Sequence, residues 1–257
     1  MKKLRYIALT LCLLISGCIT SQKDTAFQTS TIDALLAGVY DGEMSCRQLL
    51  KQGSFGIGTF NHLDGEMIVL DNNLYQIKSD GNIYKPALSI KTPFATVCQF
   101  KADNTAIIEP GSSFEDVEAV LDKTFPNQNL FYAIKITGQF ESIRSRSVPA
   151  QKKPYPPLKE VTKNQPEFNM KNISGTIVGF RCPVYVKGIN VPGYHLHFIS
   201  DDKNKGGHVL SLKVKKVNCE VDILNRYSLL LPKDAKEFAE TDLSKDRSKE
   251  LKVVEKR

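Results

Sequence analysis

The second half of the chain contains the stretch Gly193-Tyr194-His195-Leu196-His197-Phe198. Side chains of a β-strand alternate between two faces, so His195 and His197 are expected on one face and Leu196 on the other. The turn-like residues 201–207 follow, end in two glycines and lead directly into His208. A hairpin at this turn would bring His208 onto the same face. The stretch therefore predicts a β-sheet that presents three imidazoles on one side.

Three converging imidazoles with one open position are the usual protein ligands of a catalytic zinc ion. A single His-x-His pair on a strand would more often reflect packing or surface chance. However, the chain has only four histidines, and three of them fall in this hairpin. The pattern therefore favours a metal site formed by His195, His197 and His208. Copper, nickel and iron also accept imidazole ligands, so the residues alone do not select zinc.

The remaining sequence shows a mixture of short strands and helices. Short helices are expected at 31–36 and 44–51. From residue 56 onward, short apolar runs are broken by Asp64-Gly65, Asn72-Asn73 and Asp80-Gly81, which is typical of turns between antiparallel strands. Further expected elements are strands at 95–100, 106–108 and 130–140, a helix at 113–123, and strands at 174–180, 194–200, 208–215 and 217–223.

Residues 149–166 contain five prolines. Proline lacks an amide donor and restricts the residue before it, so this segment is expected to be neither helix nor central strand. We interpret it as a connection between an N-terminal sheet domain, residues 31–150, and a C-terminal metal-binding sheet domain, residues 151–257. The last part of the second domain, residues 232–257, alternates charges and is expected to be partly helical and largely solvated.

The N-terminus resembles a bacterial lipoprotein signal. A basic start precedes an apolar run at residues 6–15, which is too short to span a bilayer. The run ends in Leu14-Ile15-Ser16-Gly17-Cys18, which is similar to the lipobox. We therefore expect residues 1–17 to be removed, Cys18 to carry lipid, and residues 18–30 to be a polar tether. The protein would then be anchored to a bacterial membrane and face the periplasm or the exterior. An ordinary secretory signal is the alternative.

The composition is that of a globular protein, because 41% of the residues are hydrophobic. Removal of residues 1–17 would lower the net charge from +7 to +4, and no dense basic run suggests nucleic-acid binding. Apart from Cys18, the mature chain would contain Cys46, Cys98, Cys182 and Cys219. Three pairings of these four thiols are possible and the sequence does not choose among them. Buried free thiols are the default expectation.

Three longer motifs resemble those of the alpha-acetolactate decarboxylase family. They are Gly56-Ile57-Gly58-Thr59-Phe60-Asn61-His62-Leu63-Asp64-Gly65-Glu66, Arg144-Ser145-Arg146-Ser147-Val148-Pro149, and Val191-Pro192-Gly193-Tyr194-His195-Leu196-His197-Phe198 with Gly206-Gly207-His208. The similarity runs in order from about residue 38 to residue 232. It implies an α/β fold of the α+β type with mixed sheets, in which two sheet-based halves hold the metal site between them. It also suggests a homodimer.

The resemblance implies two glutamates in the active site. Glu66 matches the glutamate beside the metal, although its spacing alone would suggest a solvated residue after a turn. Glu255 matches the C-terminal glutamate that folds back to the site. Glu250 lies close by in the same charged tail, so the match of Glu255 is the weaker one.

The resemblance also implies the substrate-binding residues. Arg146 matches the arginine that contacts the substrate, and Arg144 is a second candidate. Thr59 is expected to line the pocket, although it could equally be an ordinary strand residue. His62 is not expected to be a metal ligand, because the family motif does not require histidine there.

The reaction implied by the resemblance is the zinc-dependent decarboxylation of 2-acetolactate to (R)-acetoin and CO2. Loss of CO2 leaves two electrons on the carbon beside a ketone, and a Lewis acid at the ketone oxygen would stabilise them. Arg146 would orient the substrate carboxylate. Glu66 or Glu255 would act as the general acid.

Two other functions remain compatible with the residues. A zinc hydrolase would use the open position for an activated water, although the His-Glu-x-x-His motif of metalloproteases is missing. A metal- or solute-binding lipoprotein would also accept a three-histidine site, but it would not require Arg146 or the glutamates. Release of acetoin from acetolactate distinguishes the decarboxylase from both.

Overall fold

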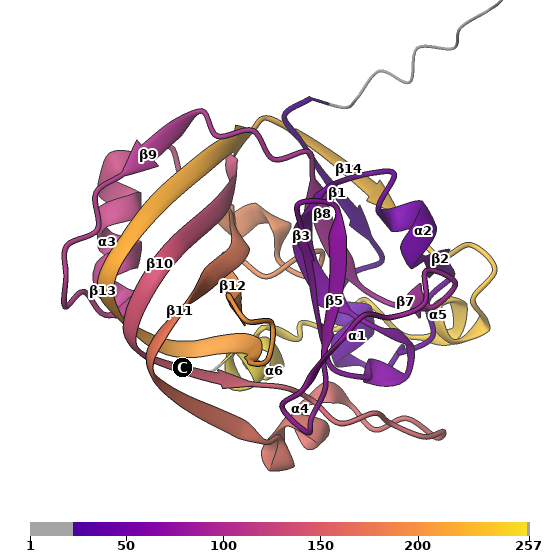
Figure 1. Cartoon of the computed structure of the whole chain (residues 1–257). Coiled ribbons are helices and arrows are strands. Elements are labelled where there is room, and N and C mark those ends of the chain that lie inside the picture. The colour runs from indigo at the N-terminus through magenta and orange to yellow at the C-terminus, as the bar shows by residue number, and fades with distance from the viewer. Residues whose placement is uncertain (1–22, 256–257) are drawn as a thin grey trace, which may run out of the picture.

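Residues 23–255 are described by a computed structural model, and they form two main β-sheets with short helices around them (Figure 1). The first sheet has seven strands in the order β14-β1-β8-β3-β4-β5-β6. Its strands are β1 (Thr25–Thr29), β3 (Phe55–Thr59), β4 (Glu66–Leu70), β5 (Asn73–Ile77), β6 (Ile83–Tyr84), β8 (Ala95–Cys98) and β14 (Arg226–Leu230). The run β3-β4-β5-β6 is the antiparallel meander that the turn residues predict.

The second sheet has five strands in the order β10-β11-β12-β13-β9. They are β9 (Asn104–Ala106), β10 (Phe131–Arg146), β11 (Glu167–Cys182), β12 (Gly193–Ser200) and β13 (Gly206–Leu224). Because β13 also pairs with β10 along most of its length, the sheet closes on itself. A separate pair is formed by β2 (Met44–Ser45) and β7 (Lys91–Thr92). The predicted fold class, α+β with mixed sheets, is confirmed.

Six α-helices accompany the sheets within residues 23–255. They are α1 (Ile32–Leu36), α2 (Cys46–Leu49), α3 (Phe114–Thr124), α4 (Leu158–Val161), α5 (Lys236–Glu240) and α6 (Ser248–Val254). The helix α3 begins where the sequence predicts, because Ser113 and Asp116 form a reciprocal capping box. Among residues 23–255, no helix has the length and apolar character needed to cross a membrane.

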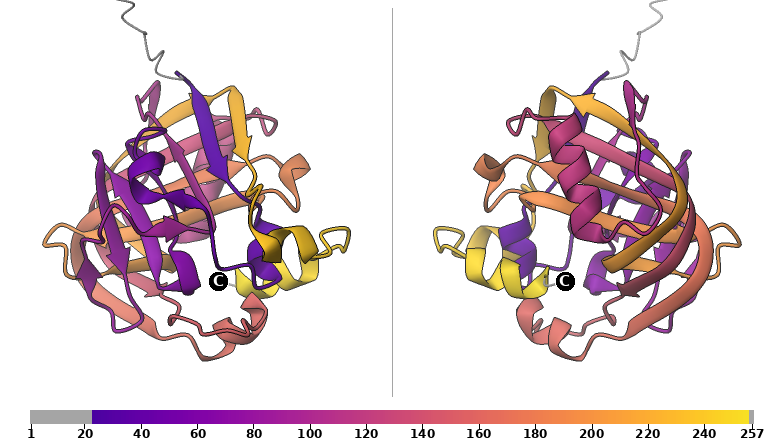
Figure 2. Two further views of the ribbon diagram at one scale, coloured as in Figure 1. Left: turned by 90° about the vertical axis from the view of Figure 1, so that its right-hand side faces the viewer. Right: turned by 90° about the vertical axis from the view of Figure 1, so that its left-hand side faces the viewer.

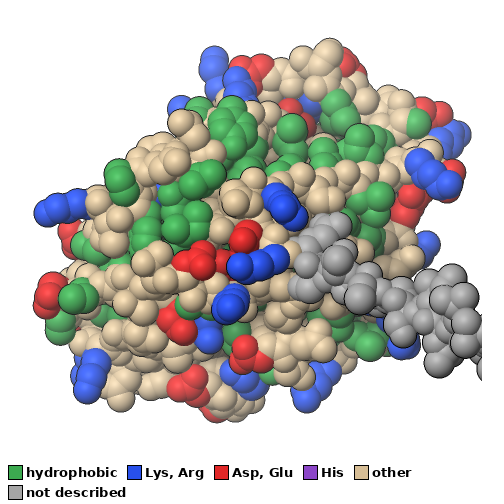
Figure 3. Space-filling model, turned by 90° about the horizontal axis from the view of Figure 1, so that it is seen from above, with side chains coloured by type: hydrophobic (Ala, Val, Ile, Leu, Met, Phe, Trp, Pro, Cys, Tyr) green, Lys and Arg blue, Asp and Glu red, His purple; other side chains and the backbone are tan. Residues whose placement is uncertain are grey.

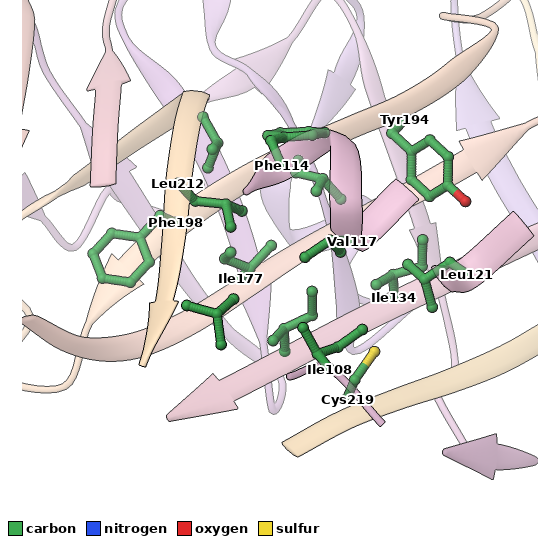
Figure 4. Close-up of a cluster of buried hydrophobic side chains, with 14 of the residues drawn as sticks. Ile108, Phe114, Val117, Leu121, Ile134, Ile177, Tyr194, Phe198, Leu212 and Cys219 are labelled. Atoms are coloured by element: carbon green, nitrogen blue, oxygen red, sulfur yellow. The ribbon is translucent and has the colours of Figure 1, made fainter. Parts of the chain in front are cut away.

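Two hydrophobic cores lie on the two sides of the closed sheet. On one side, Phe114, Val117 and Leu121 of α3 pack against residues of β10, β11, β12 and β13 (Figure 4). On the other side, Phe180 and Ile199 pack against residues of the seven-stranded sheet such as Phe55 and Ile57. The second core is therefore shared by the two sheets, and the rotated views show the sheets side by side (Figure 2).

The expected boundary at residue 150 does not separate the two sheets. The strand β10, before the boundary, pairs with β11, after it, from Tyr132↔Arg181 to Arg146↔Glu167. The strand β14 lies far beyond the boundary, yet it pairs in parallel with β1. The proline-rich segment is thus a connection within the closed sheet, and it contains the helical turn α4, which the sequence did not predict.

The expected tether at residues 18–30 is too long. Residues 18–22 lie outside the described part of the chain, but Thr25–Thr29 form the buried strand β1. The polar side chain of Gln28 is accommodated because its Nε2 donates to the carbonyl oxygens of Ser30 and Ile189. Burial of this segment therefore depends on partners distant in sequence, which composition does not reveal.

The surface and the thiols agree with a globular protein. Seen from above, basic and acidic side chains are interspersed with apolar ones (Figure 3). Four cysteines within residues 23–255 are buried and free, as expected from the sequence: Cys46, Cys98, Cys182 and Cys219.

Candidate metal centre and active site

The three histidines of the predicted hairpin converge on one face of the closed sheet. His195 and His197 lie on β12, and His197 is paired in register with His208 on β13. One ring nitrogen from each of the three lies within 4.8 Å of the others. The hairpin brings the chain close to Arg146, and Gly207 permits this approach because it has a φ of +134° and no side chain.

His197 has the environment of a metal ligand. Its Nδ1 lies 3.0 Å from the backbone oxygen of Met67, so Nδ1 carries the proton and donates it. Its Nε2 is buried and has no hydrogen-bond partner among the described residues. Burial, reinforced by the charge of His195, holds the pKa of His197 well below its usual value. A neutral imidazole whose other nitrogen is fixed by a carbonyl is what a divalent metal requires.

Glu66 faces the histidines from the other sheet. It is the first residue of β4, and its Oε2 lies 3.6 Å from Nε2 of His197. Burial raises the pKa of Glu66 to about 7; the nearby Arg146 lowers it and Glu255 adds to the rise. The prediction that Glu66 lies beside the three histidines is thus supported by its position, and the solvated alternative is wrong.

Arg146 is the last residue of β10 and is 4% exposed. Its Nη1 lies 3.2 Å from Oε1 of Glu66, and its Nη2 lies 4.0 Å from Oε1 of Glu255. Nη2 also donates to the backbone oxygen of Val254 at 3.3 Å. Its Nε finds no acceptor among the described residues. The guanidinium therefore bridges two carboxylates at the centre of the site.

Glu255 reaches the site from the C-terminal tail. It directly follows α6, and its Oε2 lies 3.4 Å from Nε2 of His208. The apolar side chains of Leu251 and Val254 fix the helix against α1 and α4. Glu250, the other candidate, points away and pairs with Lys159 at 3.5 Å. Of the two glutamates in the tail, it is Glu255 that lies in the site.

Three other predicted residues have distinct positions. Thr59 borders the same cavity, but its hydroxyl donates to the backbone oxygen of Gly65 at 2.7 Å and so closes the β3–β4 turn. Arg144 lies outside the cluster and pairs with Glu167 at 3.3 Å. His62 is also outside it: its Nδ1 lies 2.5 Å from the hydroxyl of Tyr155.

One side of the cavity was missed by sequence reasoning. The cavity that the histidines, Glu66 and Arg146 border is also lined by apolar residues, which include Ile32, Leu35, Leu63, Phe94, Leu158 and Val254. They come from distant parts of the chain and belong to one buried cluster outside the two sheets. Apolar residues of this kind give no local signal that separates a cavity wall from ordinary core. The carbonyl of Met67, which accepts the hydrogen bond from His197, was missed too, because a backbone group has no sequence motif.

Comparison with known proteins agrees with this geometry. Residues 26–245 match the family described as alpha-acetolactate decarboxylase. The alpha-acetolactate decarboxylase of Methanosarcina mazei is 46% identical over 95% of this chain and 84% of its own length. That of Methylococcus capsulatus is 42% identical over 89% of this chain and 88% of its own. The crystal structure of alpha-acetolactate decarboxylase from Bacillus subtilis strain 168 has a TM-score of 0.88 and 39% identity, and it covers 91% of this chain and 100% of that one.

A two-sheet fold with a convergent histidine, glutamate and arginine cluster defines a candidate metal-dependent enzyme. The chain belongs to the alpha-acetolactate decarboxylase family. The family predicted from the three sequence motifs is thereby confirmed, and with it the enzyme class, a decarboxylase that acts on acetolactate.

Proposed function

We propose that the protein decarboxylates 2-acetolactate to (R)-acetoin and CO2 with a zinc ion held by His195, His197 and His208. The observation that carries the proposal is the convergence of three imidazoles with Arg146 and two glutamates in one cavity. Nε2 of His197, which is buried and accepts no hydrogen bond from residues 23–255, fits a metal ion, as does an all-imidazole donor set. When bound, zinc supplies Lewis-acid stabilisation of the negative charge that develops on the substrate oxygens.

Arg146 orients the substrate. Its guanidinium group is buried and carries a permanent positive charge. Its Nε donates to no acceptor among residues 23–255. A substrate oxygen placed there would complete its hydrogen bonding. Glu66, which accepts from Nη1, and the backbone oxygen of Val254, which accepts from Nη2, keep the guanidinium plane fixed, so the substrate meets a preorganised donor.

Glu66 and Glu255 are the carboxyl groups that can deliver the proton. Loss of CO2 leaves an enediolate whose carbon must be protonated from one face to give a single enantiomer of acetoin. The two glutamates approach the cavity from different elements, β4 and the end of α6, and therefore from different directions. The raised pKa of Glu66 keeps it protonated closer to neutrality than an exposed glutamate.

The direct test is turnover of racemic 2-acetolactate by the purified protein, with acetoin analysed by chiral gas chromatography. We expect one enantiomer of acetoin, and CO2 released in equal amount. A protein that contains metal but forms no acetoin would contradict the proposal. Hydrolysis of ester or amide substrates would then support the hydrolase alternative, and tight metal or solute binding alone would support the binding lipoprotein.

We also propose that Cys18 is lipidated and anchors the enzyme to a bacterial membrane, facing the periplasm or the exterior. The support is the stretch Leu14-Ile15-Ser16-Gly17-Cys18 after a basic start and an apolar run. Mass analysis of the N-terminal peptide from membranes should show an acylated Cys18, and Cys18→Ser should move the protein to the soluble fraction. An unmodified Cys18 in wild-type protein would contradict this.

A homodimer is proposed from family membership. Light scattering on a soluble form that lacks residues 1–22 should give twice the mass of one chain. A monomer mass at micromolar concentration would contradict it.

A further inference from the structure

The apolar residues that line the cavity form a tightly packed wall. They belong to a buried cluster that joins α1, α4 and α6 outside both sheets. Leu35, Leu158 and Val254 of this cluster are 6%, 5% and 2% exposed, so their positions are fixed by packing. The histidines, Glu66 and Arg146 of the same cavity come from β4, β10, β12 and β13, and Glu255 comes from the end of α6. The cavity is thus lined by both charged and apolar side chains.

The chemistry of the substrate requires both kinds of lining. The carboxylate, hydroxyl and ketone oxygens of 2-acetolactate require Arg146 and the histidine side. What remains are two methyl groups, one on the carbon that loses CO2 and one on the acetyl group. Methyl groups gain from burial against apolar side chains and not against ions. The apolar wall is therefore expected to contact the alkyl substituents.

Val254 differs from the other apolar residues of the wall because it is connected to Arg146 and Glu255. Its backbone oxygen accepts a hydrogen bond from Nη2 of Arg146 at 3.3 Å, and Glu255 follows it directly in the chain. Val254 therefore keeps a fixed position relative to the groups that hold the substrate oxygens. Its link to Arg146 uses the backbone, so a change of its side chain leaves that hydrogen bond in place.

We propose that Val254 is a specificity-determining residue that limits the size of the alkyl substituent on the reacting carbon. This inference rests on the proposed function. A shorter side chain at 254 opens space beside the substituent, and a longer one removes it. The size of one methylene is enough to change selectivity in an apolar pocket by about tenfold or more.

The test compares 2-acetolactate with its homologue 2-ethyl-2-hydroxy-3-oxobutanoate. For each substrate, kcat/KM is measured with the zinc-loaded enzyme, and the ethyl-to-methyl ratio is calculated. Val254→Ala should raise this ratio by about tenfold. Val254→Ile should lower it by a similar factor, because the added methylene fills the space that the ethyl group needs.

Val161→Ala is the matched control. Val161 lies on α4 in the same buried cluster and is 7% exposed, but it does not border the cavity. Its truncation should lower stability and leave the ratio within about twofold of wild type. The inference is overturned if Val254→Ala and Val254→Ile both leave the ratio unchanged, or if Val161→Ala changes it equally. Absence of acetoin from wild type with both substrates would instead contradict the proposed function.

Discussion

Nη1 of Arg146 lies 3.2 Å from Oε1 of Glu66. This contact joins the end of β10 in the closed sheet to the start of β4 in the seven-stranded sheet. Both side chains are nearly inaccessible to solvent, so neither charge is stabilised by water. The pair therefore couples the packing of the two sheets to the geometry of the active site.

Loss of the guanidinium should be costly for stability. Arg146→Ala leaves the buried Glu66 and the half-buried Glu255 without their counter-charge and should lower the free energy of unfolding by about 3 kcal/mol. Arg144→Ala removes a partly exposed ion pair two residues away and should cost less than about 1 kcal/mol. Urea unfolding of both variants at one pH checks this. Equal losses would show that the buried pair has no special role in stability.

The two tail glutamates should differ sharply in activity. Glu255→Gln keeps the shape of the side chain but removes an acid in reach of the substrate, so kcat should fall by roughly 10²-fold or more. If Glu255 is the proton donor, the remaining acetoin should also lose enantiomeric purity, because water protonates both faces. Glu250→Gln, within the preceding helix α6, should stay within about twofold of wild type. Full activity and purity in Glu255→Gln would assign the proton to Glu66.

Gly207 should be intolerant of a side chain. A Cβ at this position would lie 2.4 Å from the backbone oxygen of Arg146, and its φ of +134° is unfavourable for other residues. Gly207→Ala should therefore displace His208 and Arg146 and reduce both metal content and activity. Gly111→Ala is the control: its φ is +85°, but a Cβ there meets nothing within 4 Å. That variant should lose only roughly 1–2 kcal/mol of stability and retain its metal. Retained metal and activity in Gly207→Ala would contradict the close approach.

The titration of Asp222 should make the free energy of unfolding fall as the pH rises from about 4 through about 6. Burial raises its pKa to about 6, and the nearby carboxylates Asp103 and Asp24 add to the rise. The folded state then binds more protons than the unfolded state between the unfolded pKa and pH 6, so a rising pH destabilises the fold.

Asp222→Asn removes this titration and keeps an oxygen for the amide of Lys101. The stability of the variant relative to wild type should therefore increase by about 1 kcal/mol between pH 5 and pH 7.5. Urea unfolding of both proteins at the two pH values measures the difference. A constant difference would contradict the raised pKa.

The β12–β13 hairpin with its three histidines could be predicted from the sequence because it depends on residues that are close together in the chain. Alternation in β12 fixes the faces of His195 and His197, and the glycine turn fixes the return of the chain to His208. The position of Arg146 could be inferred only by resemblance. The strand expected from the sequence ended at residue 140, whereas β10 continues to Arg146 because β11 and β13 both pair with it.

Elements that depend on distant partners were not predictable in the same way. The parallel pairing of β14 with β1 joins residues about 200 positions apart, and it turns an expected tether into a buried strand. The role of Val254 in the cavity wall depends on α6 folding back over α1 and α4. A valine in a charged tail carries no local sign of that contact.

The most direct test of the central claim, a three-histidine metal centre that supports decarboxylation, is zinc content and acetoin formation measured on the same samples. His197→Ala should lose bound zinc and acetoin formation together. His62→Ala, whose imidazole lies outside the cluster, should retain both. Wild type should contain about one zinc per chain and lose activity to a chelator in a way that added zinc reverses. A His197→Ala variant that still forms acetoin at the wild-type rate would contradict the account.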